Sequence, residues 1–249
     1  MQRIGKQFIY GVFYLAIFGG LIYASYFFLV KPAPTCTDRK QNQEEAGLDC
    51  GGPNCAPCTA GLSPVAIRLS TVLRGAEPVA LVRLANPNTT FGAERISYRI
   101  EVLDSGDAAL RTLEGETFVY PGEQEKNLVF SLAGLTDARS LRVTLGEPQW
   151  KPLSDFSKPD FTFVQTRVSF KDGKAIVQGE IRSNETVLFD NVTVGAIFFS
   201  ESGDLVGASQ TSVQTVEAFE RRAFNIEFPL GNLTINPDST RFYYNARRP

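Results

Sequence analysis

The sequence predicts an all-β protein in which two tandem β-sandwiches follow one membrane-spanning helix and a small disulfide-stapled segment. Three observations support this prediction. Residues 8–30 carry no charge, all four cysteines lie between residues 36 and 58, and much of the remaining chain alternates apolar and polar side chains. Such alternation is typical of half-buried strands. A length of 249 residues suggests two ordinary domains, or one large one, with appendages.

The uncharged stretch at residues 8–30 is long enough to cross a bilayer. As a helix its 23 residues would reach about 34 Å, and the hydrocarbon core of a bilayer is about 30 Å thick. A cleaved signal peptide is the main alternative, but its apolar region would be only about 7–15 residues long. A buried core helix and a lipoprotein anchor fit less well. We therefore expect a lipid bilayer as the partner of residues 8–30.

The cysteines, rather than the basic residues, indicate the orientation in the membrane. Lys and Arg are divided almost equally, because Arg3 and Lys6 precede the stretch while Lys31, Arg39 and Lys40 follow it. Clustered cysteines are typical of proteins in an oxidising compartment, where disulfides form and persist. We expect a single-pass plasma-membrane protein with a cytoplasmic tail at residues 1–7 and with residues 31–249 outside the cytoplasm.

Residues 31–61 are predicted to form a cysteine-rich stalk. Its cysteines are Cys36, Cys50, Cys55 and Cys58. The segment has too few apolar residues to fold around its own core, so two disulfides would hold it. The sequence allows three pairings and does not choose among them. A four-cysteine zinc site is the alternative, although only Cys55 and Cys58 have the C-x2-C spacing of such sites.

Four hard oxygen ligands lie among these cysteines, within twelve residues: Asp38, Asn42, Glu45 and Asp49. Ca²⁺ prefers carboxylate and amide oxygens, so a loop that turned these side chains inward could hold the ion. Their spacing is not that of an EF-hand. The alternative is that they accept hydrogen bonds from backbone amides in turns, as Asp and Asn often do. Calcium is the one cofactor that the sequence suggests.

The stretch from Cys36 to Cys58 matches a known short motif. It contains all the elements of C-x-D-x3-N-x2-E-x3-D-C-G-G-x-C-x2-C, with one extra residue between Gly52 and Cys55. In this it resembles a segment of many bacterial surface and secreted proteins. The resemblance implies an extracytoplasmic location and little about chemistry.

Two copies of one strand pattern follow, which we assign to residues 62–147 and 160–249. Corresponding positions lie 97 or 98 residues apart, as in the pairs Asn86 and Asn184, Phe91 and Phe189, Gly106 and Gly203, and Glu123 and Glu220. This offset is the size of one β-sandwich domain, so it indicates an internal duplication. Between the copies, residues 148–159 are rich in proline and charge and are predicted to form a semi-rigid linker.

Several motifs of the second copy occur together in known domains. They are V-x-G-x-I-x-S-N from Val177 to Asn184, the turn F-F-S-E-S-G-D at residues 198–204, and Glu220 before a Phe-rich strand. Through these motifs the second copy resembles the FxLYD-type and late-embryogenesis-abundant-14-like domains. It departs from the family pattern at Ser200, where an acid is usual. The resemblance implies that both sandwiches are immunoglobulin-like and, for many family members, implies no defined activity.

The residue inventory argues against catalysis and against nucleic-acid binding. The chain has no histidine, so triads that rely on imidazole cannot form. Acid pairs such as Asp104 with Asp107 lie around glycines in predicted hairpin turns, where acids favour the turn itself. A net charge of -2 does not fit a protein built to neutralise phosphates. We expect no catalytic residues and no nucleic-acid partner.

Trp150 lies in the predicted linker, where it would either wedge the sandwiches together or offer an exposed anchor to a partner. We expect a membrane-anchored, non-catalytic binding or scaffold protein of the cell envelope, which contacts an unidentified envelope protein through sheet edges or loops. Two alternatives are a calcium-dependent adhesion or sensing module and, as the second resemblance implies, a protective domain with broad, weak client binding.

Overall fold

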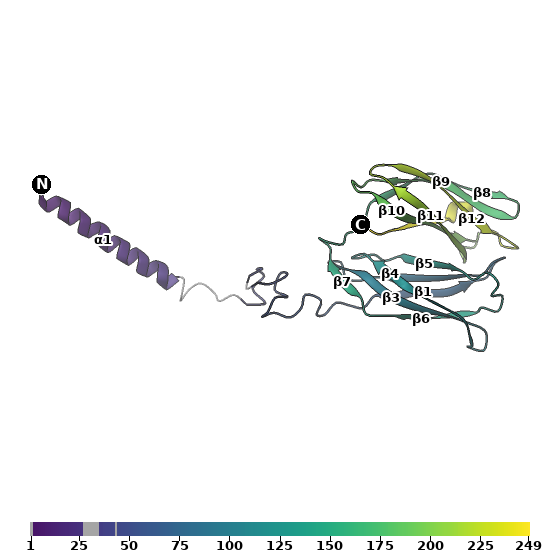
Figure 1. Cartoon of the computed structure of the whole chain (residues 1–249), viewed down its shortest axis with the longest axis horizontal. Coiled ribbons are helices and arrows are strands. Elements are labelled where there is room, and N and C mark those ends of the chain that lie inside the picture. Colours follow the sequence, from purple (N-terminus) through teal and green to yellow (C-terminus); the bar gives the residue numbers. More distant parts are fainter. Residues whose placement is uncertain (1, 27–34, 43) are drawn as a thin grey trace. The chain divides into compact units, whose positions relative to one another are not determined.

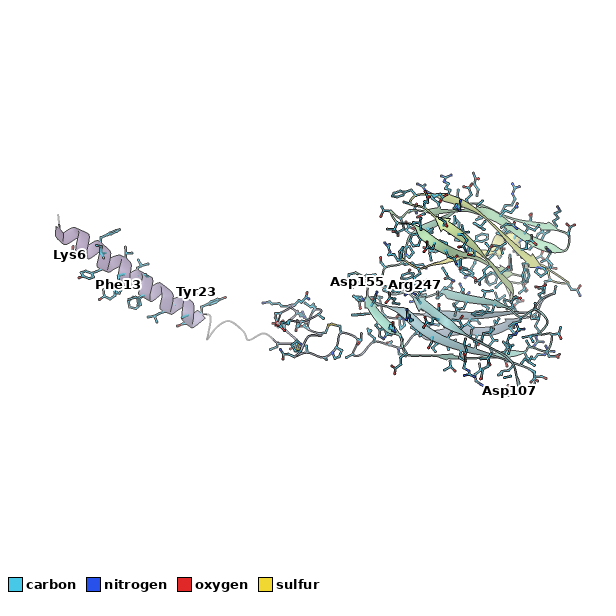
Figure 2. The ribbon with its side chains drawn as sticks, viewed as in Figure 1. Lys6, Phe13, Tyr23, Asp107, Asp155 and Arg247 are labelled. Atoms are coloured by element: carbon cyan, nitrogen blue, oxygen red, sulfur yellow. A yellow bond between two sulfur atoms is a disulfide. The ribbon has the colours of Figure 1, made fainter. Side chains whose placement is uncertain are left out.

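The computed structural model describes residues 2–26, 35–42 and 44–249 (Figure 1 and Figure 2). The chain divides into two compact units, Met1–Gly61 and Leu62–Pro249. The first unit contains a helix and the cysteine-rich segment, and the second is built of strands with a short 3-10 helix at Pro237–Ser239. The prediction of an all-β protein with an N-terminal apolar helix and two disulfides is confirmed.

Helix α1 (Gln2–Ser25) contains most of the uncharged stretch. At 100° per residue, Phe13, Leu15 and Leu21 lie on different sides of this helix, and all three are largely exposed, so the helix is apolar all round. The part from Gly5 to Ser25 is long and apolar enough to cross a membrane, and a signal sequence would have the same character.

The bounds of α1 differ from those of the predicted span. The helix begins at Gln2, so residues 2–7 of the predicted tail are helical. No proline interrupts these residues, and Gly5 costs the helix only about 1 kcal/mol, which explains why the helix extends ahead of the uncharged stretch. Residues 27–30 of the predicted span lie outside the described residues.

Two antiparallel sheets form the first sandwich. One contains β1 (Ala66–Leu73), β2 (Val79–Ala85) and β5 (Lys126–Ser131), in the order β1-β2-β5. The other contains β4 (Ala109–Val119), β3 (Phe91–Leu103) and β6 (Ser140–Leu145), in the order β4-β3-β6. Apolar side chains between the sheets make the first core, with Val82, Ile96 and Ile100 at its centre.

The second sandwich repeats this topology. One sheet contains β8 (Phe161–Lys171), β9 (Lys174–Ser183) and β12 (Arg221–Pro229), in the order β12-β9-β8. The other contains β10 (Phe189–Phe199), β11 (Leu205–Val216) and β13 (Arg241–Ala246), in the order β11-β10-β13. Substituting β8 to β13 for β1 to β6 reproduces both sheet orders. A repeat of topology therefore accompanies the repeat in the sequence.

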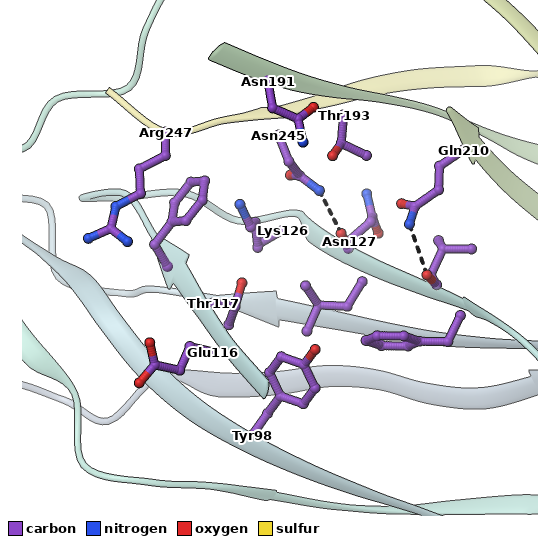
Figure 3. Close-up of a pocket in the computed structure, with 14 residues that line it drawn as sticks. Tyr98, Glu116, Thr117, Lys126, Asn127, Asn191, Thr193, Gln210, Asn245 and Arg247 are labelled. Carbon is purple, nitrogen blue, oxygen red and sulfur yellow. Dashed lines mark hydrogen bonds between the residues drawn. The ribbon is translucent and has the colours of Figure 1, made fainter. Parts of the chain in front are cut away.

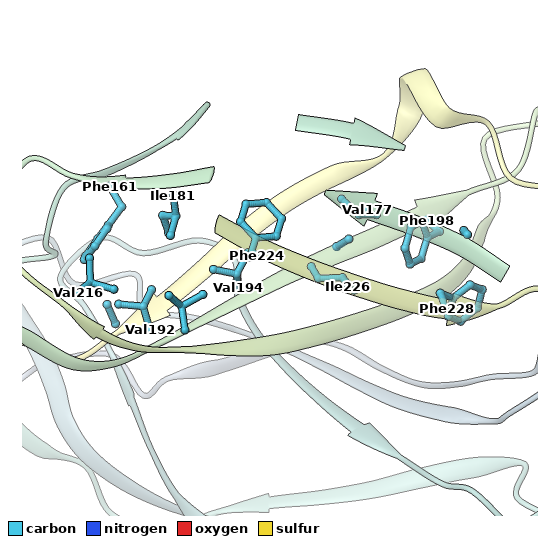
Figure 4. Close-up of a cluster of buried hydrophobic side chains, with 14 of the residues drawn as sticks. Phe161, Val177, Ile181, Val192, Val194, Phe198, Val216, Phe224, Ile226 and Phe228 are labelled. Carbon is cyan, nitrogen blue, oxygen red and sulfur yellow. The ribbon is translucent and has the colours of Figure 1, made fainter. Parts of the chain in front are cut away.

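Aromatic side chains fill the core of the second sandwich (Figure 4). Phe198 of β10 stacks on Phe228 of β12 with 4.9 Å between ring centroids, and Phe161 meets Phe189 edge to face at 5.0 Å. Such pairs contribute about 0.5–1.5 kcal/mol each beyond the area they bury. The two sheets are therefore joined by specific ring contacts as well as by general burial.

The segment at residues 148–159, predicted to be a semi-rigid linker, contains a strand of the first sandwich. This strand, β7 (Gln149–Pro152), pairs with residues 91–95 of β3, next to the part of β3 that β6 covers. Pro152 stands at the end of β7, and an edge strand tolerates proline there because one side makes no ladder hydrogen bonds. The segment is therefore part of the first sandwich.

The sandwiches pack face to face through strand β2. Six of its seven residues, Val79–Ala85, are buried, as is typical of a strand covered on both faces. Val82 points into the first core, while Leu81 packs with Ala208 of β11. The sheets β1-β2-β5 and β11-β10-β13 are thus the two inner layers of a four-layer body (Figure 1).

Side-chain amides of the second sandwich cover the outer edge of β5. Gln210 Nε2 donates to the carbonyl oxygen of Val129 at 3.0 Å, and Asn245 Nδ2 donates to that of Asn127 at 2.9 Å. An uncovered edge of this kind would offer its carbonyl groups to a strand of another chain. The second sandwich therefore protects an edge of the first.

Replacing Gly195 by alanine should lower the free energy of unfolding by about 1–3 kcal/mol, the usual cost of overpacking. Gly195 of β10 lies opposite Tyr243 of β13, and a Cβ atom at residue 195 would collide with the tyrosine ring. Urea denaturation followed by circular dichroism measures the loss. Gly106→Ala is the control, because Gly106 lies in a turn with room for a Cβ; an equal loss in both variants would contradict the prediction.

Candidate functional site

Two interleaved disulfides hold the cysteine-rich segment. Cys36 pairs with Cys55 and Cys50 pairs with Cys58, which is one of the three pairings that the sequence allows. All four sulfurs are used, so the predicted zinc alternative is wrong for this structure. Glu45 lies close to Cys36 and Cys55, within 4.8 Å, but sulfurs in a disulfide have no thiolate to offer a metal.

Two of the predicted oxygen ligands bind backbone amides. Both carboxylate oxygens of Asp49 accept a hydrogen bond from the amide of Arg39, at 2.9 and 3.0 Å. Buried Glu45 accepts from the amides of Asn42 and Asp49 through one oxygen, at 3.2 and 3.3 Å. These contacts are those expected of acids that stabilise turns. Asp49 has positive φ, which such a reversal requires and Asp tolerates better than most residues.

Asp38 and Asn42, the other two predicted ligands, contact one another. Asn42 Nδ2 donates to Asp38 Oδ2 at 2.9 Å, and this bond is the main reason why the pKa of Asp38 is lowered. Asn42 Oδ1 is buried and accepts no hydrogen bond from the described residues. A buried oxygen without a donor carries a desolvation cost that a cation would offset. This atom is the observation that favours calcium over turn capping alone.

Replacing both Cys50 and Cys58 by serine should unfold the cysteine-rich segment without affecting the sandwiches. The disulfide spans 8 residues, and closing such a loop stabilises it by about 2–3 kcal/mol in the chain-entropy view. Limited proteolysis should then cut within residues 35–61, while the melting transition of the strands stays in place. Thr59→Ser is the control. Wild-type resistance to proteolysis in the double variant would contradict the prediction.

Trp150 packs on the core of the first sandwich. It lies on β7 opposite Ala93, is half-buried, and belongs to the cluster that contains Val65 and Val119. The expectation that Trp150 packs between the two sandwiches is therefore wrong, because β7 pairs with β3 and the tryptophan packs on the first core. The other expectation, an anchor for a partner, stays a prediction.

Tyr120, which the sequence did not single out, makes a polar contact between the sandwiches. Its hydroxyl donates to the carbonyl oxygen of Ala246 at 2.8 Å and accepts from the amide of Arg248 at 3.3 Å. Its ring stacks on Phe156, which is 3% exposed, with centroids 4.4 Å apart. Burial is the main reason why the pKa of Tyr120 is raised. The end of the predicted linker and the C-terminal end of the chain thus meet at this side chain.

A pocket of about 330 Å³ lies beside this junction, between β4 and β5 of the first sandwich and β10, β11 and β13 of the second (Figure 3). Its wall on the first sandwich includes the aromatic side chains Tyr98, Phe118 and Phe130, together with polar residues such as Glu116 and Thr117. Its wall on the second sandwich is polar and includes Asn191, Gln210 and Asn245. A cleft that combines apolar and hydrogen-bonding side chains is the usual form of a small-ligand site.

Lys126 is the exceptional residue of this pocket. It is 2% exposed, and its ammonium lies 3.3 Å from the centroid of the Phe118 ring. The pKa of Lys126 is lowered to about 7, mainly by burial; the charge of Glu123 opposes this shift, and that of Lys158 adds to it. Glu123 is itself held by Lys158 Nζ at 2.8 Å and by the amide of Tyr120 at 3.0 Å. Among the described residues, no hydrogen bond or ion pair joins the Lys126 ammonium to another side chain.

Lys126 was not among the predicted site residues, although the strand period contained a signal. Leu128 and Phe130 alternate along β5 and face the first core, and Lys126 stands two residues before Leu128 on the same face. A lysine in phase with a core face is unusual, since lysine is rarely fully buried without a partner.

Replacing Lys126 by methionine should raise the free energy of unfolding by about 1–3 kcal/mol at pH 6, because an unpaired charge is then no longer buried. Between pH 7 and 10.5 the unfolded lysine binds a proton that the folded one has lost, so wild-type stability rises with pH. The advantage of the variant should therefore shrink across this window. Urea denaturation at pH 6, 8 and 10 measures it, with the exposed Lys171→Met as control. An advantage that does not depend on pH would contradict the prediction.

No family model and no curated protein matches this chain. Among solved structures, red sea bream transglutaminase is 12% identical over 75% of this chain, with a TM-score of 0.23. The chain spans 31% of the length of that protein. Tandem CBM22 domains of a Paenibacillus barcinonensis protein are 10% identical, with 75% of this chain and 91% of theirs covered and a TM-score of 0.15. Both scores are too low to indicate a shared fold, so the resemblances to FxLYD-type domains, late-embryogenesis-abundant-14-like domains and the bacterial surface motif stay predictions.

Proposed function

We propose that this chain is a membrane-anchored, non-catalytic binding or scaffold protein of the cell envelope, with its sandwiches outside the cytoplasm. The observation that carries the proposal is an apolar helix and two disulfides in one chain with a compact β body. A helix of this length and composition supports a membrane anchor, and disulfides support an oxidising compartment. Immunoglobulin-like sandwiches, as the sequence predicts, would present edges and loops to a partner.

The outer edge of β4 supports binding through a sheet edge. β4 is eleven residues long, stands at the end of its sheet and pairs with β3 on its inner side. No described strand covers the outer side. A partner strand could add there, with hydrogen bonds between main chains. Arg111, Glu114 and Glu116 are exposed along β4, and such charges discourage indiscriminate pairing while they select a partner of matching charge.

Thiol labelling in native membranes tests the proposed topology. A membrane-impermeant maleimide should label the cysteines only after reduction, because all four are in disulfides. Labelling should not require disruption of the membrane. Labelling that needs membrane disruption would place the segment in the cytoplasm and would contradict the proposal.

Site-specific photo-crosslinking of the full-length protein in the same membranes tests the proposed binding edge. A crosslinker at exposed Thr112 of β4 should capture one reproducible protein partner, and one at exposed Asn225 of β12 should not. Recovery of no reproducible partner would count against a scaffold. Weak capture of many proteins at both positions would instead favour the protective alternative.

Calcium binding by the cysteine-rich segment is a second candidate function, favoured by the unpartnered oxygen Asn42 Oδ1. Calorimetric titration of the full-length protein with Ca²⁺ should then release heat, and Asn42→Ala should abolish the signal. Thr37→Ala, a neighbouring exposed position, should leave it unchanged. No heat and no melting shift at millimolar calcium would remove this candidate.

A further inference from the structure

Ion pairing around the pocket leaves the ammonium of Lys126 without an acidic partner among the described residues. The acids near the pocket are each paired with a cation of their own: Glu116 with Arg95 at 3.4 Å, and Glu123 with Lys158 at 2.8 Å. Lys126 has no such partner among the described residues. Arg247 lies at the rim, where it reaches Glu94 at 3.5 Å, but Glu94 is held more closely by Lys151 at 2.7 Å. Most of the five guanidinium donors of Arg247 therefore remain for another acceptor.

Burying a lysine in this way is costly, and the cost is one that an anionic ligand would offset. An ammonium taken out of water without an ion-pair partner loses several kcal/mol of hydration, and the face of one aromatic ring returns only about 2 kcal/mol. Asn191 and Asn245 line the same cavity. Asn191 accepts from Ser212 through its oxygen, and Asn245 donates one amide hydrogen to Asn127, so each amide nitrogen has a hydrogen left to donate. Cation, amide donors and aromatic wall thus surround one open space (Figure 3).

We propose that the pocket between the sandwiches binds a small organic carboxylate, with the carboxylate group on Lys126 and Arg247 and the apolar body against Tyr98 and Phe130. The volume of about 330 Å³ is at the lower end for ligand pockets, which suits a small molecule and excludes a folded partner. The aromatic wall favours an apolar body over a simple inorganic anion. The site involves the sandwiches alone and does not depend on the proposed membrane anchor or on the β4 edge.

Isothermal titration of the full-length protein in detergent with benzoate at pH 6 tests the site. Benzoate should bind, and benzyl alcohol, which keeps the ring without the charge, should bind at least about tenfold more weakly. Lys126→Met should weaken benzoate binding at least about tenfold, and Arg247→Gln by about threefold or more. Arg241→Gln is the matched control, because Arg241 begins β13, the strand that Arg247 follows, but does not line the pocket. Lys126→Met is expected to fold, since it removes a buried charge.

The dependence of binding on pH separates an ammonium ligand from a purely structural lysine. The groups that face Lys126 or the pocket are Glu116, Glu123, Tyr98, Lys158 and Arg247. With a pKa of about 7, Lys126 loses its proton between pH 6 and pH 8, so benzoate affinity should fall by up to about tenfold. The fall should be absent in Lys126→Met. No binding at millimolar benzoate, equal binding of benzyl alcohol, or wild-type affinity in Lys126→Met would each overturn the proposal.

Discussion

Replacing Leu81 by aspartate should lower the free energy of unfolding of the two-sandwich body by more than about 5 kcal/mol, which is enough to unfold many natural domains. Leu81 has no exposed surface and packs in the cluster that joins β2 to β11. Loss of a buried leucine alone costs about 2–5 kcal/mol, and an unpaired carboxylate at the same place adds several more. Because the residue lies between the sandwiches, both should be affected.

Two probes distinguish joint unfolding from unfolding of one half. Trp150 is the only tryptophan of the chain and lies on the first sandwich, so its fluorescence reports that half. Circular dichroism reports the strands of both. In urea the two signals should shift together in Leu81→Asp, whereas Ile67→Asp, at a position 41% exposed on β1, should cost about 1 kcal/mol or less. Retention of half the dichroism transition at the wild-type midpoint would show that the sandwiches are independent.

Replacing Phe198 by alanine should cost about 3–5 kcal/mol, the usual range for a buried phenylalanine. The side chain is fully buried and stacks on Phe228, so the substitution leaves a cavity and removes a ring pair. The measurement is again urea denaturation with both probes. If the sandwiches unfold as one unit, the Trp150 signal should shift as well, although Trp150 and Phe198 belong to different cores.

Phe170→Ala serves as the control for Phe198→Ala. Phe170 is on β8 of the same sandwich but is 52% exposed, so its loss should change the midpoint little. A shift as large as that of Phe198→Ala would mean that the exposed face of β8 contributes to stability. An unchanged Trp150 transition in Phe198→Ala would contradict the expected coupling between the sandwiches.

The order of apolar and polar residues predicted most of the strands, because it follows which side chains of a strand are buried. The run of apolar residues in β2 indicated a strand, and the offset of 97–98 residues indicated two copies of one arrangement. What the run in β2 did not indicate is which surface covers its second face. That surface, around Ala208, comes from the other copy more than 120 residues later, and pattern within one strand carries no information about it.

The linker was mispredicted for a reason that lies in its composition. Pro148, Pro152 and Pro159 suggested a spacer, but Pro148 precedes β7 and Pro152 ends it, where an edge strand tolerates a missing amide. The disulfide pairing and the environment of Lys126 were beyond the sequence for a different reason. Both depend on which backbone segments approach one another, and the spacing of cysteines or lysines does not determine that approach.

The edge of β5 is covered only after the second sandwich has been synthesised. Ser131 ends β5, and Asn245, which bonds to the main chain of this strand, is synthesised 114 residues later. At about 5–20 residues per second, the ribosome adds Asn245 roughly 5–25 s after Ser131, and until then the second sandwich is incomplete. During that interval Leu81 and the carbonyl groups of β5 are open to neighbouring nascent chains. Synthesis, rather than the finished state, is therefore the stage at which this edge is uncovered, and slower translation of the second half would lengthen the exposure.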